Sequence, residues 1–178
     1  MDAGGEWSSR PVQSQAVPDA DETTIRAVDE ADVETLFKLI VELAEYEKLA
    51  DKVRGDAEVL RRTLFEERAA EALLLERGGE AIGYAIFFTT FSSFECRSGI
   101  WMEDVYVRPE HRRGGIGRRV IEHLAQLAIE RGHVRLEWCA LDWNEPALNF
   151  YDKLGATRLD GWTMLRVDGE RLRQLAQN

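Results

Sequence analysis

The chain of 178 residues is long enough for one domain with a substantial core and hardly long enough for two. Its formal net charge of −10 disfavours general nucleic-acid binding, which requires a basic face, and suits either solubility or a cationic partner. No apolar run approaches the ~18 residues of a membrane span, and no basic segment precedes an apolar one at the N-terminus, so we expect a cytoplasmic protein that does not bind a membrane.

The cysteines indicate neither a disulfide framework nor a zinc site. Cys96 and Cys139 are the two in the chain, and no metal-type spacing relates them. We therefore expect no metal, and we expect both thiols to be reduced and partly buried.

The N-terminal segment differs in composition from the rest of the chain. Residues 1–22 are rich in Gly, Ser, Pro, Gln and acids and show no apolar period. Such a composition is typical of a flexible tail. We expect a single folded domain over residues 23–178.

Strand and helix patterns then alternate along the chain. Apolar alternation and short apolar runs predict strands at 23–28, 72–76, 81–88, 98–107, 134–141 and 162–167. Apolar residues at helical spacing predict helices from about 31 to 43, from about 55 to 64, and at 115–131, 145–154 and 169–176. This order predicts an α/β fold in which helices cover the faces of a sheet.

A glycine-rich turn between a strand and a helix predicts an anion site. In "MEDVYVRPEHRRGGIGRRVIEHL", residues 102–124, a strand-like run ends at Pro109, arginines and glycines follow, and an amphipathic helix begins. Consecutive backbone N–H groups in such a turn form a concave anion nest, and the helix dipole adds to it. A basic turn at a solvated helix start is the alternative reading.

The spacing separates this loop from other phosphate loops. The chain contains no G-x-x-x-x-G-K-[ST] string. A dinucleotide fingerprint fits loosely, because Val120 occupies the position of its third glycine and Glu137 lies inside a predicted strand. The pattern Arg112-x-x-Gly115-x-Gly117 fits fully.

That pattern resembles the acyl-CoA pyrophosphate loop of the GNAT superfamily of N-acetyltransferases. Five segments, one of which contains the loop, are similar to the spermidine/spermine and thialysine N-acetyltransferase branch: "AEYEKL", "MEDVYV", "RRGGIGRRVIEHLA", "DWNEPALNFYDKLGA" and "GWTMLRVDGERLRQLA". The resemblance covers roughly residues 23–176. The resemblance implies the GNAT acyl-CoA N-acyltransferase fold, a mixed and mostly antiparallel sheet flanked by helices. It also implies acetyl-CoA as co-substrate and a homodimer with the C-terminal segment at or near the interface.

The resemblance assigns cofactor contacts to three parts of the chain. Backbone N–H groups of the strand before the loop would bind the acetyl carbonyl and the pantetheine arm, the loop would bind the pyrophosphate, and the helix near the C-terminus would contact the pantetheine chain and the sulfur. The residues are Val105, Tyr106, Val107, Arg112, Arg113, Gly114, Gly115, Ile116, Gly117, Arg118, Asn144, Ala147 and Tyr151. Asn144 is also suited to a helix N-cap.

Acetyl transfer to an amine needs a base and benefits from an acid. An alkyl ammonium has a pKa of ~10.4, so a carboxylate acting directly or through water helps to supply the neutral nucleophile. Glu103 and Asp104 are adjacent on a predicted strand, so only one is expected to point into a cleft on a given face. The resemblance selects Glu103 as base or amine-binding carboxylate and Tyr151 as the acid for the leaving thiolate. An alternative reading makes Glu103 and Asp104 ordinary surface or ion-paired acids. From the residues alone, Tyr151 is a helix aromatic packed in the core, and only the resemblance makes it the acid.

The substrate side rests on the resemblance as well. Its expected amine-binding residues are Tyr46, Glu47, Glu103, Glu137, Trp138, Cys139 and Asp160. Carboxylates suit a polyamine, a diamine or a lysine- or thialysine-like amino acid, because each ammonium prefers an anionic partner. The chain departs from the polyamine enzymes at residues 89–98 and just before Gly161, which puts polyamine specificity in doubt and leaves acetyl transfer intact.

The predicted function is therefore transfer of an acetyl group from acetyl-CoA to a primary amine by direct attack in a ternary complex. A protein amine is an alternative acceptor, and a non-catalytic acyl-CoA sensor or assembly module is an alternative class. An acetyl-cysteine route through Cys139 is disfavoured, because a free cysteine in an apolar strand usually behaves as a small hydrophobe.

Overall fold

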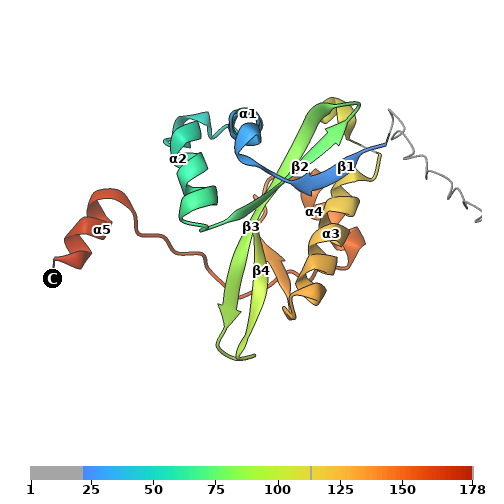
Figure 1. Ribbon diagram of the computed structural model, residues 1–178. Coiled ribbons are helices and arrows are strands. Elements are labelled where there is room, and N and C mark those ends of the chain that lie inside the picture. Colours follow the sequence, from blue (N-terminus) through green and yellow to red (C-terminus); the bar gives the residue numbers. More distant parts are fainter. Residues whose placement is uncertain (1–21, 113, 178) are drawn as a thin grey trace, which may run out of the picture. The chain divides into compact units, whose positions relative to one another are not determined.

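The computed structural model describes residues 22–112 and 114–177, and the expected tail at 1–22 lies outside these ranges except for Glu22. The described chain forms two compact units, one through Cys139 and one from Ala140 onward, and each is treated by itself (Figure 1).

The first unit is built on a five-stranded sheet in the order β1-β2-β3-β4-β5. The strands are β1 (Thr24–Ala27), β2 (Glu71–Arg77), β3 (Glu80–Ser92), β4 (Arg97–Val107) and β5 (Leu136–Trp138). The first four pair antiparallel, and β4 and β5 pair parallel. The mixed and mostly antiparallel sheet expected for a GNAT fold is confirmed.

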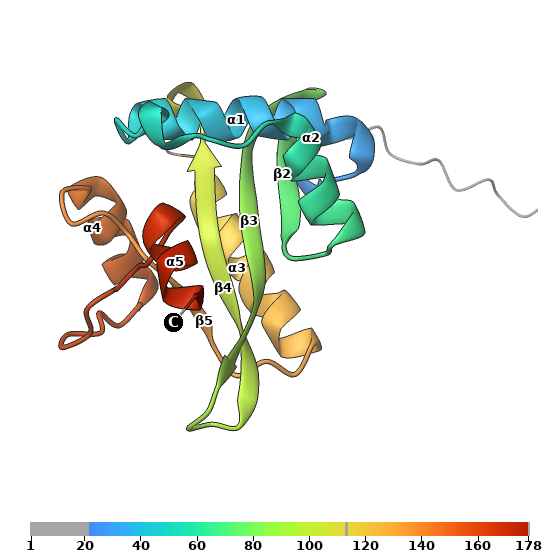
Figure 2. The same cartoon turned by 90° about the vertical axis from the view of Figure 1, so that its left-hand side faces the viewer.

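Helices cover both faces of this sheet. The α-helices are α1 (Val33–Tyr46), α2 (Ala57–Arg61) and α3 (Ile116–Glu130). Short 3-10 helices form η1 (Glu30–Asp32), η2 (Ala50–Lys52) and η4 (Pro109–His111), and a π-helical segment, η3 (Arg62–Glu66), continues α2. Figures 1 and 2 show α1 and α2 on one face and α3 on the other. Asp29 caps η1 through a capping box and Asp56 caps α2, because each side chain accepts a bond from a backbone N–H of the first turn.

The core forms where the apolar faces of the helices meet the sheet. On the α1 face the fully buried side chains include Leu36, Leu39, Leu74 and Tyr84. On the α3 face Ile116, Val120 and Leu124 are buried at helical spacing. The apolar periods of the sequence therefore identified the correct helix faces.

A β-bulge interrupts the pairing of β3 with β4. Ile86 pairs with Asp104 and the next residue, Phe87, pairs with Met102, so Glu103 is an extra residue on β4. A bulge bends the strand locally and changes the direction of its side chains.

A glycine is required just beyond the bulge. A Cβ atom at Gly83 would lie 2.2 Å from the carbonyl oxygen of Tyr106 and 3.1 Å from Cα of Val107. β3 and β4 approach each other closely at this pair, where β4 leads into the glycine loop.

The second unit contains α4 (Glu145–Leu154) and α5 (Gly169–Ala176). Asn144 is the N-cap of α4, and Gly155, with φ of 85°, ends it as expected.

Two strand predictions need correction. The strand expected at 134–141 is limited to Leu136–Trp138, and residues 162–167 form no strand in the described chain. Trp162 is 79% exposed and Leu165 is 87% exposed. An alternating pattern becomes a strand only beside another strand, and no neighbour pairs with this segment within the part of the chain described.

No helix of the described residues has the length and apolar character to cross a membrane.

Candidate active site

The loop between β4 and α3 has the geometry of an anion cradle. Gly115 adopts φ of 74°, a conformation that disfavours other residues, and it is the N-cap of α3. Within the described part of the chain no side chain caps this helix, and its first turn contains no acid. The first N–H groups of a helix have no acceptor within the helix, so those of Ile116, Gly117 and Arg118 are available to an anion. An added Cβ at Gly115 would meet nothing within 4 Å, which leaves room for a ligand against the backbone.

Arg108 anchors the start of this loop. Its guanidinium donates to both carboxylate oxygens of Glu42 on α1, at 2.9 and 2.7 Å. It also donates to Glu80 and to the carbonyl oxygen of Ala81, and the pKa of the Glu42 carboxyl is lowered by its bonds to Arg108. These bonds fix the end of β4 to α1 just before the glycine loop begins.

Arg112 braces the loop from the inside. Its Nε donates to the carbonyl oxygen of Val107 at 2.7 Å, and its guanidinium carbon lies 4.5 Å from the ring centroid of Tyr46 and 5.8 Å from that of Tyr106. Tyr46, which the sequence assigned to the amine, thus packs against the cofactor loop. Arg118 is exposed and lies 3.6 Å from Glu122, and Arg113 lies outside the described residues.

After Met102, one edge of β4 pairs with no other strand of the described residues. Its pairing with β5 ends at Met102 and Trp138. Because the N–H of Arg108 donates to Ile82 on β3, strand alternation points the N–H groups of Val105 and Val107 away from β3 and that of Tyr106 toward it. Two of the three backbone donors expected for the acetyl carbonyl and pantetheine arm therefore face the open edge.

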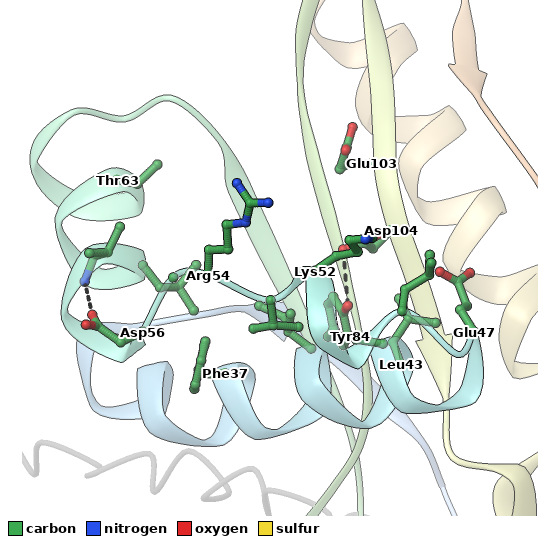
Figure 3. Close-up of a pocket in the computed structure, with 17 residues that line it drawn as sticks. Phe37, Leu43, Glu47, Lys52, Arg54, Asp56, Thr63, Tyr84, Glu103 and Asp104 are labelled. Atoms are coloured by element: carbon green, nitrogen blue, oxygen red, sulfur yellow. Dashed lines mark hydrogen bonds between the residues drawn. The ribbon is translucent and has the colours of Figure 1, made fainter. Parts of the chain in front are cut away.

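A cleft opens on the α1 face of the sheet, with a volume of about 490 Å³. It is lined by α1, the segment from Leu49 to Asp56, α2, η3, β3 and β4 (Figure 3). Four carboxylate residues line it: Glu47, Asp56, Glu103 and Asp104. Asp56 uses its Oδ1 to cap α2, so Glu47, Glu103 and Asp104 are the acids left for a ligand. The expectation that only one of Glu103 and Asp104 could face a cleft was wrong, because the bulge at Glu103 breaks the strict alternation of the strand.

The buried end of the cleft favours protonated carboxyls. Burial raises the pKa of Asp104, the charge of Glu103 raises it further, and a hydrogen bond from Tyr84 opposes the rise. Burial also raises the pKa of Glu47, with a further contribution from the charge of Asp104. A cation would relieve both costs, since an opposite charge stabilises the ionised form.

Glu103 lies nearer the surface and is oriented by a neighbour. The indole Nε1 of Trp101 donates to Glu103 Oε2 at 2.9 Å. The pKa of the Cys139 thiol is raised, mainly because neighbouring atoms partly remove its sulfur from water and also because of the charge of Glu103, although the residue as a whole is exposed. A thiol with a raised pKa is a poor nucleophile, which argues against an acetyl-cysteine route. Both cysteines are exposed, so the expectation of partly buried thiols was wrong.

The other predicted residues are distributed over both units. Glu137 lies on β5 with its carboxylate 2.7 Å from Nε of Arg135, and Trp138 follows it on the same strand. In the second unit Asn144 Oδ1 accepts from the N–H of Ala147 at 3.4 Å, Tyr151 lies on α4 beside Phe150, and Asp160 is exposed. Their functional roles stay predictions.

The cleft contains groups that the sequence did not identify. Asp104, Tyr84, Lys52 and Arg54 all line it. The adjacent acids in "MED" were the one signal in the sequence for Asp104. Nothing in the sequence distinguishes Tyr84 from a tyrosine packed in an ordinary apolar strand, or Arg54 from other surface arginines.

Comparison with known proteins gives the class. The Acetyltransferase (GNAT) family matches residues 36–156. The chain is 38% identical to a thialysine N-epsilon-acetyltransferase of Bos taurus over 164 residues, which cover 85% of this chain and 96% of that protein. It is also 38% identical to one of Caenorhabditis elegans over 146 residues, covering 80% and 90%. The chain belongs to the GNAT acetyltransferase family.

The fold is also shared with solved structures. An integron cassette protein from the mobile metagenome of V. cholerae superposes with a TM-score of 0.75 at 26% identity, over 88% of this chain and 98% of that one. A five-stranded mixed sheet with helices on its faces is thus the family architecture in this chain as well.

Proposed function

We propose that the protein transfers the acetyl group of acetyl-CoA to a primary amine of a small cationic substrate, by direct attack within a ternary complex. One observation carries the proposal: a single strand, β4, supplies two acids of the cleft, Glu103 and Asp104, and leads directly into the glycine loop. Because a strand rises ~3.3 Å per residue, Asp104 and Arg108 lie roughly 13 Å apart along it. A cofactor held at the loop can therefore extend along the open edge of β4 toward an amine in the cleft.

The chemistry requires a neutral amine at the thioester. The carboxylates of Glu47, Glu103 and Asp104 attract the ammonium form, and Glu103 then accepts its proton directly or through water. The amine nitrogen forms a bond to the carbonyl carbon, the carbon–sulfur bond breaks, and the thiolate takes up a proton. The N–H groups of Val105 and Val107 face the side on which the carbonyl oxygen would develop negative charge.

The second unit supplies the other half of this proposal. Tyr151 is the proposed proton donor to the thiolate, and Asn144 and Ala147 are proposed contacts of the pantetheine chain. Family membership supports these roles, and so does the α4 geometry, in which Asn144 caps the helix that bears Tyr151. Residues 23–178 would then act as one transferase domain.

Amine binding by the remaining residues is part of the same proposal. Glu47 has the strongest support because it lines the cleft. Tyr46 packs on Arg112 and would act by supporting the cofactor loop, whereas Glu137, Trp138, Cys139 and Asp160 would contact the amine from β5 and the second unit. The relatives named for thialysine favour a small amine over a protein amine.

A thioester-cleavage assay with acetyl-CoA and a panel of amines tests the function. The panel contains polyamines, diamines, basic amino acids and a lysine-bearing peptide. We expect acetyl-CoA-dependent turnover with at least one small amine. Turnover with the peptide alone would establish the protein-amine alternative, and binding of acetyl-CoA without turnover would establish the sensor alternative.

We further propose a cytoplasmic homodimer. The segment after α4 exposes an unusual set of apolar side chains: Leu159, Trp162, Met164, Leu165, Val167, Leu172 and Leu175. A second copy of the chain would remove these side chains from water. The free thiols of Cys96 and Cys139 suit a reducing compartment. Light scattering at micromolar concentration should return twice the mass of the chain, and a monomer would exclude this assembly.

A further inference from the structure

The acidic cleft also contains an arginine that forms an ion pair with no carboxylate of the described residues. Arg54 lies between η2 and α2, is exposed, and lines the cleft together with Glu47, Glu103 and Asp104. Among the described residues it makes no hydrogen bond or ion pair within bonding distance. The charge of Arg54 makes a small contribution to lowering the pKa of Asp51, but the carboxylate of Asp51 already pairs with Lys52, at 2.8 Å from Nζ.

The neighbouring basic residues are different in this respect. Arg61 pairs with Glu58 at 3.0 Å and with Glu66 at 2.6 Å, and Arg62 pairs with Glu67 at 3.1 Å. The acid nearest to Arg54 in sequence, Asp56, uses its Oδ1 to accept from the N–H of Val59 at 2.8 Å. The chain therefore neutralises the arginines of α2 and η3 and leaves Arg54 for another anion.

Figure 3 shows where that anion would lie. The side chain of Arg54 extends from its segment into the cleft, on the side where Glu103 is also drawn, while Glu47 lies near the end of α1. The cleft thus presents carboxylates on its α1 and β4 walls, and a third wall with two basic side chains, Lys52 and Arg54, beside the helix-capping Asp56. Lys52 pairs with Asp51, which leaves the guanidinium of Arg54 as the unpaired cation of this wall among the described residues. Such a lining complements a molecule that has a cationic end and an anionic end.

We propose that Arg54 binds the carboxylate of the amine substrate, which makes the acceptor an amino acid whose side chain ends in a primary amine. This inference rests on the proposed acetyl transfer and specifies its substrate class. A guanidinium binds a carboxylate through two parallel hydrogen bonds, which fixes the orientation of the bound molecule. The distal ammonium is then directed toward Glu103 and Asp104.

The same residue selects against polyamines. A polyamine or diamine would bring a second ammonium to the wall where Arg54 lies, and like charges repel there. The cleft acids alone would accept either class of amine, because each ammonium needs only an anionic partner. Arg54 therefore separates them by attraction of one class and repulsion of the other.

The test compares an amino acid with the diamine that lacks its carboxylate. L-Lysine and cadaverine form one pair, and L-ornithine and putrescine form a second. We expect the wild-type enzyme to have the higher kcat/KM with the amino acid of each pair. Arg54→Gln should lower kcat/KM for the amino acid by roughly 10–100-fold, mainly through KM, since a charge-assisted hydrogen bond is lost. The same variant should leave the diamine unchanged or improve it.

A matched control removes one positive charge elsewhere. Arg62→Gln affects an exposed arginine outside the cleft and should leave the ratio of amino acid to diamine unchanged. Arg54→Lys should recover part of the preference, because an ammonium still attracts a carboxylate. Equal losses for both members of a pair in Arg54→Gln would overturn the inference, as would a wild-type preference for the diamines. A wild-type enzyme that binds acetyl-CoA and acetylates no amine would instead overturn the proposed function, and the inference with it.

Discussion

The hydroxyl of Tyr84 on β3 donates a hydrogen bond to Oδ2 of Asp104 on β4, at a distance of 3.2 Å. The two residues occupy one face of the sheet, and both line the cleft. The bond supports the ionised form of Asp104, yet burial dominates and raises the pKa of this carboxyl above its ordinary value. The cleft therefore contains an acid that gains from a bound cation.

Replacement of Asp104 by asparagine should alter the pH dependence of stability. The native carboxyl holds its proton more tightly than the unfolded one, so the free energy of unfolding falls as pH rises from the unfolded pKa of ~3.9 through the raised native pKa. Asp104→Asn removes the titrating group and therefore removes this fall in the free energy of unfolding. We expect a higher Tm than wild type at neutral pH, with a smaller decrease between about pH 4 and pH 7, measured by thermal unfolding across pH. Asp142→Asn, at an exposed acid, is the control, and a variant as pH-sensitive as wild type would contradict the assignment.

Gly83→Ala should destabilise the sheet beside the loop. The new methyl group would lie 2.2 Å from the Tyr106 carbonyl oxygen, so β3 and β4 would have to separate. We expect a loss of roughly 1–3 kcal/mol in the free energy of unfolding, as for other overpacked sites. The control is Gly55→Ala, where a Cβ meets nothing within 4 Å, and that variant should be neutral or slightly stabilised. Equal stabilities of the two variants in denaturant unfolding would be inconsistent with the close approach.

The accuracy of the sequence prediction depended on whether a feature was local. The capping acids Asp29 and Asp56, the glycine turn at Gly115 and the apolar face of α3 were all predictable, because neighbours in sequence determine each of them. The presence of both Glu103 and Asp104 in the cleft lining was not predictable, since the bulge arises from the register of β4 against β3. The strand prediction for residues 162–167 was wrong for a related reason. The alternation of these residues indicates a strand, but a strand also needs a neighbouring strand, and no strand of the described residues pairs with this segment.

The charged residues of the cleft also divide into those that the sequence could predict and one that it could not. Glu47 and Glu103 were found through family resemblance, which compares motifs. Arg54 has no motif, and its importance follows from the absence of a partner in three dimensions, within the residues that the structure describes. The pairing of Arg61 and Arg62 with nearby glutamates could have been guessed from helical spacing, but the open position of Arg54 could not.

Gly115→Glu should abolish CoA binding and leave the protein folded. The carboxylate would enter the nest of N–H groups and repel phosphate. Asparagine tolerates positive φ and carries no charge, so Gly115→Asn is the matched control and should retain more affinity. Thermal shift with acetyl-CoA and with desulfo-CoA is the measurement, and both ligands should raise the Tm of the wild type, because the pyrophosphate rather than the sulfur anchors them. An unchanged response of Gly115→Glu would move the cofactor site elsewhere.

Tyr151→Phe should show whether Tyr151 acts as the general acid, as distinct from the residues that bind the amine. The substitution removes the phenolic proton and keeps the ring on α4. If Tyr151 protonates the leaving thiolate, kcat should fall by roughly 10²–10⁴-fold. KM for acetyl-CoA should change little, because the loop at Gly115 holds the phosphates. A thiol with a pKa of ~8.5 is already a fair leaving group, so the lower part of that range is the more natural outcome.

Glu103→Gln is the comparison that gives this last experiment its meaning. It removes the charge from the cleft while an amide can still accept from Nε1 of Trp101. Its effect should fall on the amine side, as a higher KM for the amine, a lower kcat, or both, with CoA affinity retained. Single-turnover kinetics must first show that chemistry limits turnover. Under that condition, a Tyr151→Phe enzyme with wild-type kcat would exclude Tyr151 as the acid, and the thiolate would then leave without a protein proton donor at this position.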